Sequence, residues 1–147
     1  MIIKSLEQLN SLSKKIADQL KEKDYIFLIG EIGVGKTTFT RFLINYLQKK
    51  EGLKASEVLS PTFNLLYEYD LKKYKIMHYD LYRLNNEEEL NNLGILKENE
   101  DAIKIIEWPK IIKIHISNKL EINLDYTKKN NERKLRLFGT GKWKNFE

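Results

Sequence analysis

A glycine-rich stretch in the first third of the chain has the residue types and spacing of a phosphate-binding loop. Residues 30–37 read GEIGVGKT and match the pattern G-x-x-x-x-G-K-[ST] at every fixed position. Glycines let backbone N–H groups converge on phosphate oxygens, and Lys36 supplies a positive charge for the β- and γ-phosphates. The Thr37 hydroxyl can coordinate Mg²⁺, and the Thr38 hydroxyl can contact the α-phosphate. An apolar run precedes this stretch and a helical pattern follows it, so the sequence predicts a P-loop nucleotide-binding domain.

Two acidic residues that follow apolar runs are candidates for chemistry at the phosphates. Asp80 ends KIMHYD, and Glu107 ends AIKIIE. An acid at a strand end beside a P-loop typically helps to hold Mg²⁺, and Glu107 can also polarise an attacking water. The alternative is that Asp80 caps a turn and that Glu107 is a solvated acid at a strand end. The presence of two such acids after one P-loop favours the functional interpretation of both.

Three further side chains near these acids add weaker signals. Thr62 lies in a loop between the P-loop and Asp80, where some P-loop switches place a threonine that senses the γ-phosphate and Mg²⁺. Trp108 directly follows Glu107 and is either a core residue or a lid or docking anchor. His78 lies two residues before Asp80, on the same strand face, and we expect it to pack or to hydrogen-bond.

The periodicity of apolar residues predicts the elements that position these side chains. Helical spacing covers residues 5–20, 35–50 and 86–95. Apolar runs predict strands at 25–30, 64–70, 74–82 and 102–108, and a hairpin at 119–126 and 133–138. We therefore predict an α/β fold: a single P-loop domain over residues 1–147, with a central mixed, mostly parallel β-sheet flanked by helices and a C-terminal β-hairpin.

The composition excludes several classes of protein. The 147 residues suit one domain, and the absence of cysteine excludes disulfides, thiolate metal sites and cysteine catalysis. We find no secretion signal and no run long enough to cross a membrane, so we expect a cytoplasmic protein without a membrane partner. The net charge of +5 fits either a solvated, lysine-rich surface or an anionic partner such as nucleic acid or nucleotide.

The sequence departs from two motifs of guanine-specific GTPases, which disfavours that class of protein. The stretch NKLE at 118–121 nearly matches the N-K-x-D signature of GTP-binding proteins, but it ends in glutamate. Asp80 does not begin a D-x-x-G motif, because LYR follows it. We therefore interpret 118–121 as a turn before the next strand.

Four stretches in order resemble one known family. GEIGVGKTTFTR, SPTFNLLYEY, HYDLYRL and EWP are similar to the TsaE (YjeE) family, small bacterial ATPases of tRNA threonylcarbamoyladenosine synthesis. The resemblance implies a P-loop α/β fold that binds ATP with Mg²⁺ and hydrolyses it slowly. It also implies a partner, the TsaB–TsaD pair, which transfers a threonylcarbamoyl group to the adenosine beside the anticodon of tRNAs that read codons beginning with A. The chain would meet tRNA only indirectly, through that complex.

The resemblance also assigns site residues by position. The phosphates would be held by Gly33, Val34, Gly35, Lys36, Thr37 and Thr38. The metal would be held by Thr37, Asp80 and Glu107. The catalytic set would be Lys36, Thr62, Asp80, Glu107 and Trp108. Arg133 would lie near the nucleotide base, and Ser5 would make a nucleotide contact near the N-terminus. Val34 stands where the family more often has alanine, and its added bulk would crowd the loop slightly.

Two other functions stay open on the residues alone. An independent small phosphotransferase, a nucleotide or metabolite kinase, would use the same P-loop but needs a substrate pocket, usually under a lid with several arginines. Arginine is scarce here, with Arg83 alone between Arg41 and Arg133. A nucleotide-sensing or nucleic-acid-binding module without catalysis would fit the charge of +5.

Overall fold

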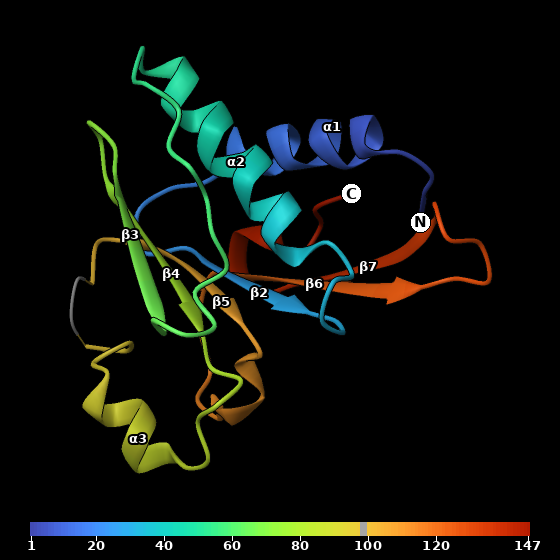
Figure 1. Ribbon diagram of the computed structural model, residues 1–147. Helices are drawn as coiled ribbons and strands as arrows, with labels where there is room; N and C mark the ends of the chain where they lie inside the picture. Colours follow the sequence, from blue (N-terminus) through green and yellow to red (C-terminus); the bar gives the residue numbers. More distant parts are fainter. Residues whose placement is uncertain (98–99) are drawn as a thin grey trace.

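A mixed β-sheet forms the centre of the structure (Figure 1). The computed structural model describes residues 1–97 and 100–147. The strands are β1 (Ile2–Ile3), β2 (Tyr25–Ile29), β3 (Leu66–Asp70), β4 (Lys75–Asp80), β5 (Ile103–Glu107), β6 (Lys119–Tyr126) and β7 (Arg133–Gly139). The helices are α1 (Leu6–Ala17), α2 (Lys36–Lys50) and α3 (Glu87–Asn92), with short 3-10 turns η1 (Pro109–Ile111) and η2 (Gly141–Trp143). Each predicted helix and strand is present, but α1 and α3 end three residues earlier than predicted, and residues 119–121, interpreted as a turn, already belong to β6. Strand β1 and turns η1 and η2 are too short to show periodicity in the sequence.

The strands lie in the order β1-β7-β6-β2-β5-β4-β3. The four central strands, β6, β2, β5 and β4, run parallel to one another. The outer strands pair antiparallel: β3 with β4, β7 with β6, and β1 with β7. The predicted α/β fold with a central mixed sheet is therefore confirmed, with parallel pairing confined to the four central strands. The predicted C-terminal hairpin is β6–β7, in which Tyr126 lies opposite Arg133.

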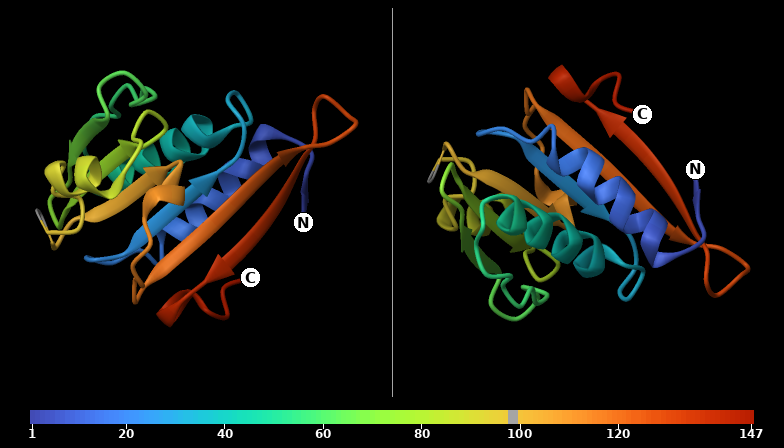
Figure 2. Two further views of the ribbon diagram at one scale, coloured as in Figure 1. Left: turned by 90° about the horizontal axis from the view of Figure 1, so that it is seen from below. Right: turned by 90° about the horizontal axis from the view of Figure 1, so that it is seen from above.

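Helices cover both faces of the sheet. Figure 2 shows α1 and α2 together on one face and α3 on the other. Successive residues of a strand point to opposite faces, so Ile26 and Leu28 of β2 pack in the core under α1 and α2, whereas Phe27 packs in the core on the α3 side. Both faces are hydrophobic, which is the pattern expected of buried parallel strands.

Helix α1 begins where its sequence predicts. The Ser5 hydroxyl caps the helix by accepting a hydrogen bond from the Gln8 N–H group at 3.2 Å, an interaction typically worth about 1 kcal/mol. Leu9, Leu12 and Ile16 are buried at helical spacing and face the sheet. Among the described residues, no helix is both long enough and apolar enough to span a membrane.

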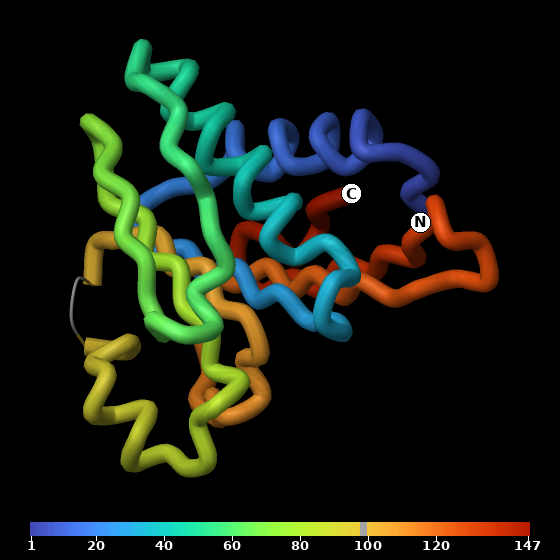
Figure 3. The backbone as a smooth tube through the Cα atoms, in the orientation of Figure 1, coloured from blue at the N-terminus to red at the C-terminus, as the bar shows by residue number. Residues whose placement is uncertain are grey.

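The carboxyl ends of the parallel strands meet at one edge of the sheet, where the P-loop leaves β2 and enters α2 (Figure 3). Strands β4 and β5 run in register, so that Asp80 lies directly beside Glu107. Open α/β sheets bind their ligands at this edge, because loops from several strands converge there. The fold therefore brings the glycine-rich turn and both predicted carboxylates to one place.

Candidate functional site

The P-loop requires glycine at two positions for steric reasons. A Cβ atom on Gly30 would lie 2.5 Å from the Leu124 carbonyl oxygen and 2.7 Å from Val34 Cγ1, so no larger residue fits. Gly33 has a φ of 79°, in the left-handed region that favours glycine. Val34 is buried, and its side chain occupies the space beside Gly30. The added bulk of this valine is thus accommodated by the missing side chain at Gly30.

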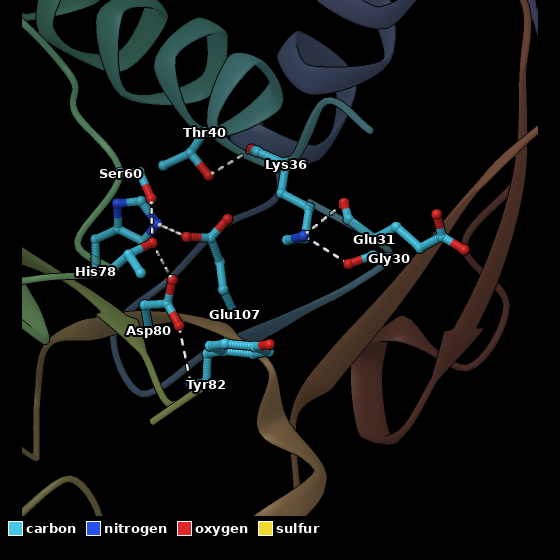
Figure 4. Close-up of polar contacts among 10 residues, drawn as sticks. Gly30, Glu31, Lys36, Thr40, Ser60, His78, Asp80, Tyr82 and Glu107 are labelled. Atoms are coloured by element: carbon cyan, nitrogen blue, oxygen red, sulfur yellow. Dashed lines mark hydrogen bonds and ion pairs between the residues drawn. The ribbon is translucent and has the colours of Figure 1, made fainter. Parts of the chain in front are cut away.

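Lys36 is folded back across the P-loop. Its ammonium group donates hydrogen bonds to the carbonyl oxygens of Gly30 at 2.6 Å and Glu31 at 3.0 Å (Figure 4). Burial lowers the pKa of Lys36, and the negative charges of Glu107 and Asp80 partly offset this effect. A desolvated cation held in this way is well placed to interact with phosphate oxygens, since electrostatic attraction is stronger away from bulk water.

The N-terminus of α2 adds backbone donors beside Lys36. Gly35 is the N-cap residue of the helix, and no side chain in the described part of the chain caps this end. The first N–H groups of a helix have no partner within it and carry the positive end of the helix dipole, so they attract anions. A Cβ atom on Gly35 would meet nothing within 4 Å, and Gly35, Lys36, Thr37 and Thr38 all line one cavity.

The Asp80 carboxylate is buried and accepts hydrogen bonds at both oxygens. Its Oδ2 accepts from the Thr62 hydroxyl at 2.7 Å, and its Oδ1 accepts from the Tyr82 N–H group at 2.9 Å (Figure 4). The Ser60 hydroxyl lies 2.8 Å from the Thr62 hydroxyl and extends this chain of polar groups. The loop that contains Thr62 is therefore joined to the end of β4.

The Glu107 carboxylate is buried, and none of the described residues forms a hydrogen bond with its Oε2. Its Oε2 lies 3.3 Å from Nε2 of the fully buried His78, without the geometry of a hydrogen bond (Figure 4). An unpaired buried carboxylate oxygen is costly. Oxygen atoms are the ligands that Mg²⁺ prefers, and Thr37 lines the same cavity as Glu107. The chemistry of this donor set fits a magnesium ion, with Glu107 less committed to protein partners than Asp80.

Trp108 connects the carboxylate to the P-loop. Its backbone is left-handed, with φ 55° and ψ 55°, which is strained for a residue with a side chain. The Lys36 ammonium lies 4.8 Å from the centre of its ring, and the Tyr82 ring packs against it at 4.9 Å between ring centres. Such contacts fix the indole beside Lys36.

One cavity of about 150 Å³ brings most of the predicted residues together. It is lined by Ile32, Gly33, Gly35, Lys36, Thr37, Thr38, Ser60, Thr62, Asp80, Glu107 and Trp108. All five residues of the predicted catalytic set belong to this lining, as do the three residues predicted to hold the metal. The cavity therefore joins a phosphate loop, a switch-like threonine and two carboxylates.

The remaining predicted residues line a second cavity of about 320 Å³. Ser5, Val34 and Arg133 belong to it, and it shares Gly33, Gly35 and Thr38 with the first cavity. The Arg133 side chain is engaged with the protein, because its Nε donates to the Val34 carbonyl oxygen at 3.0 Å. The nucleotide contacts of Ser5 and Arg133 stay predictions.

Some residues of the site carry no signal of their own in the sequence. Ser60 precedes the proline of the predicted loop, and its position in SPTF was the available clue. His78 was expected to pack or hydrogen-bond, but its position against Glu107 depends on how β4 and β5 pair. Tyr126, whose hydroxyl reaches the P-loop at the Ile32 carbonyl, follows no motif.

A phosphate loop between a parallel strand and a helix, facing carboxylates at neighbouring strand ends, defines a P-loop NTPase-like α/β domain. The chain belongs to the TsaE family. The family described as "Threonylcarbamoyl adenosine biosynthesis protein TsaE" matches residues 3–135. The resemblance stated from the four sequence stretches is thereby confirmed.

Individual relatives agree with this assignment, and one solved structure shares the fold. The "tRNA threonylcarbamoyladenosine biosynthesis protein TsaE" of Rickettsia conorii is 39% identical over 124 residues, which cover 84% of this chain and 69% of that protein. The protein of the same name from Aquifex aeolicus is 36% identical over 139 residues, or 94% of each chain. The crystal structure of YdiB from Bacillus subtilis superposes with a TM-score of 0.72 and covers 98% of this chain and 86% of that chain. At 21% identity, that likeness concerns the fold.

Proposed function

We propose that this chain is an accessory ATPase of tRNA modification, which binds ATP with Mg²⁺ and hydrolyses it slowly. Its hydrolytic cycle would support repeated turnover of the TsaB–TsaD pair, which transfers threonylcarbamoyl to the adenosine next to the anticodon. The proposal is supported by membership of the TsaE family and by the names of its relatives.

The observation that carries the proposal is the convergence of one phosphate loop and two buried carboxylates on one cavity. Lys36 and the N-terminus of α2 would bind the β- and γ-phosphates, which are anionic. Thr37 and Glu107, with Asp80 beside them, would hold Mg²⁺. The bound metal would neutralise charge on the phosphates and orient them.

Glu107 is also the residue best suited to accept a hydrogen bond from the attacking water. Its Oε2 faces the buried His78 at 3.3 Å and its other carboxylate oxygen points away from His78 (Figure 4), whereas both oxygens of Asp80 accept hydrogen bonds from the protein. A carboxylate that is free to accept can orient water for attack on the γ-phosphate. Thr62, held by Asp80, would report whether that phosphate is present.

We further propose that residues 1–147 act as a single domain in the cytoplasm and meet tRNA only through the TsaB–TsaD complex. Two separate hydrophobic cores pack on opposite faces of one continuous sheet, which supports a single folding unit. A kinase lid usually carries several arginines, whereas Arg83 is the one arginine between Arg41 and Arg133 and donates to the Phe63 carbonyl oxygen. This contact disfavours the alternative of an independent phosphotransferase.

The test is ATP hydrolysis by the purified chain, alone and with the TsaB–TsaD pair, with tRNA modification followed in parallel. We expect slow hydrolysis by the chain alone and several rounds of modification only when it is added. If the pair gains nothing and a small acceptor is phosphorylated at ordinary kinase rates, the chain is a phosphotransferase. If ATP binds but no step depends on Glu107 or Asp80, a nucleotide-sensing module explains the site better.

A further inference from the structure

The β6–β7 hairpin reaches the P-loop through Arg133, which the family resemblance places near the nucleotide base, and Tyr126, which no motif identifies. Tyr126 ends β6 and Arg133 begins β7, and the two residues lie opposite each other in the antiparallel pairing. The Arg133 guanidinium stacks over the Tyr126 ring at 4.6 Å from its centre. The pair therefore behaves as one unit at the end of the hairpin nearest the P-loop, since cross-strand neighbours of this kind stabilise each other.

Each member of the pair donates to a P-loop carbonyl oxygen. The Tyr126 hydroxyl donates to the Ile32 carbonyl oxygen at 3.0 Å, and Arg133 Nε donates to the Val34 carbonyl oxygen at 3.0 Å. The rest of the Arg133 side chain is also fixed, because its Nη1 donates to the carbonyl oxygens of Asn130 and Glu132, each at 2.8 Å. Two carbonyls, one on each side of Gly33, are thus held against the hairpin.

The direction of these carbonyls sets the direction of the N–H groups that follow them. In a trans peptide unit the C=O and the next N–H point in opposite directions. Holding the Ile32 carbonyl toward the hairpin turns the Gly33 N–H away from it, and holding the Val34 carbonyl does the same for the Gly35 N–H. Gly33 and Gly35 both line the cavity that contains Lys36.

We propose that Tyr126 and Arg133 are positioning residues that clamp the P-loop, so that the Gly33 and Gly35 N–H groups are oriented for phosphate before it binds. This inference rests on the proposed binding of ATP. Glycine-rich backbone has many accessible conformations, and ordering it on binding costs affinity. A loop whose two carbonyl groups are already held loses less conformational entropy when the phosphate binds. The clamp thereby assigns Arg133 a role at the phosphates, different from the base contact that the family resemblance implies.

Two conservative variants separate the clamp from a merely structural hairpin. Tyr126→Phe keeps the ring under Arg133 and removes the hydrogen bond to the loop, and Arg133→Gln removes the guanidinium. The matched controls are Tyr46→Phe, which loses an exposed hydroxyl bond to Asp18, and Arg136→Gln, which loses an exposed ion pair with Asp125 on the same hairpin. Affinity is measured by displacement of a fluorescent ATP analogue, with ATP and with inorganic tripolyphosphate as probes, both in the presence of Mg²⁺.

We expect the affinity of both clamp variants for ATP to fall about three- to tenfold, and their affinity for tripolyphosphate to fall by the same factor. The two controls should bind both probes like the wild type, and circular dichroism should show all four variants folded. A loss for ATP alone in Arg133→Gln would instead support a base contact and overturn the clamp.

Unchanged affinity in Tyr126→Phe would also overturn the clamp. Failure of tripolyphosphate to displace the fluorescent analogue from the wild-type protein would overturn it as well. A wild-type chain that does not bind ATP at all would contradict the proposed function itself. The failure of the clamp and the failure of the proposed function therefore give different results.

Discussion

The Thr62 hydroxyl donates a hydrogen bond to Asp80 Oδ2 across 2.7 Å and joins the loop after Pro61 to the end of β4. The Asp80 N–H group also donates to the Leu65 carbonyl oxygen at 3.0 Å, and Leu65 has a left-handed φ of 65°. A loop tied in this way to a carboxylate of the phosphate cavity can respond when a ligand competes for that carboxylate. Nucleotide switches use loops that are ordered by contacts at the phosphate site, so the contact motivates a test of Thr62.

Removing the Thr62 hydroxyl should affect hydrolysis more than binding. Thr62→Val keeps the shape of the side chain and leaves one oxygen of the buried Asp80 without its donor, at a cost of about 1–3 kcal/mol in the free energy of unfolding. We expect a lower rate of ATP hydrolysis with little change in ATP affinity. Thr62→Ser, which keeps the hydroxyl, should restore the rate. A Thr62→Val variant with wild-type turnover would exclude a switch role for this residue.

Glu107→Gln should separate binding from hydrolysis. The substitution keeps the size of the side chain and removes the negative charge beside the phosphate cavity. We expect ATP to bind while hydrolysis falls by about 10²- to 10⁴-fold, the range for loss of a general base. Glu121→Gln on β6 is the matched control, because that glutamate accepts from the Asn123 side chain at 3.0 Å and does not belong to the lining of the phosphate cavity. Equal turnover in the Glu107 variant and the control would remove Glu107 from the catalytic set.

The sequence predicts those parts of the site that depend on neighbours along the chain. The glycines and Lys36 of the P-loop act through local backbone geometry, so their spacing alone identifies them. Asp80 and Glu107 end apolar runs, and a parallel sheet brings such ends to one edge. The sequence pattern does not predict that the backbone of Trp108 is left-handed. Nor does it predict that the Lys36 ammonium donates to carbonyl oxygens of its own loop.

Relationships between distant segments could not be predicted, because they depend on register and packing. His78 meets Glu107 only because β4 pairs with β5 in one register, and a shift by one residue would turn His78 to the other face. Tyr126 and Arg133 meet the P-loop because β6 lies next to β2 in the sheet. That strand order is a property of the whole fold.

Lys36→Ala should weaken phosphate binding without unfolding the protein. Lys36 donates hydrogen bonds to two carbonyl oxygens of the loop and contacts the Trp108 ring, and these contacts belong to the site rather than to either hydrophobic core. We expect ATP affinity to fall about ten- to a hundredfold, the loss of one charge-assisted interaction. Lys49→Ala, at the exposed C-terminal end of the same helix, should bind ATP normally. A circular dichroism spectrum that shows an unfolded Lys36→Ala variant would refute this prediction.

Trp108→Ala should impair turnover in the reconstituted complex. The variant removes the ring that Lys36 and Tyr82 contact and opens the cavity beside Glu107. We expect slower multi-turnover tRNA modification with the TsaB–TsaD pair, and partial recovery in Trp108→Phe, which retains an aromatic face for the Lys36 ammonium. The measurement is the rate of modification with this chain as the limiting component. Unchanged activity in Trp108→Ala would remove the residue from the site.

Lys104 lies outside the candidate site but should govern how stability depends on pH. Its ammonium group is buried on the α3 side of the sheet, donates to the Ile95 carbonyl oxygen and lies 3.3 Å from the Tyr25 hydroxyl. Burial lowers the pKa of Lys104, and the charge of Glu100 partly offsets this. The charged form is therefore less favourable in the folded protein than in the unfolded chain.

A lowered pKa means that the folded protein releases this proton at a lower pH than the unfolded chain does. Between the two pKa values the unfolded chain binds more protons, so the Lys104 contribution to the free energy of unfolding rises with pH toward the ordinary lysine value of about 10.4. Lys104→Met does not titrate, so its stability relative to the wild type should be highest near neutral pH and should decline as the pH rises. Urea unfolding of both proteins at several pH values tests this, because all other titrating groups are common to the pair. If the stability of Lys104→Met relative to the wild type stays constant or rises with pH, Lys104 keeps an ordinary or raised pKa in the folded protein.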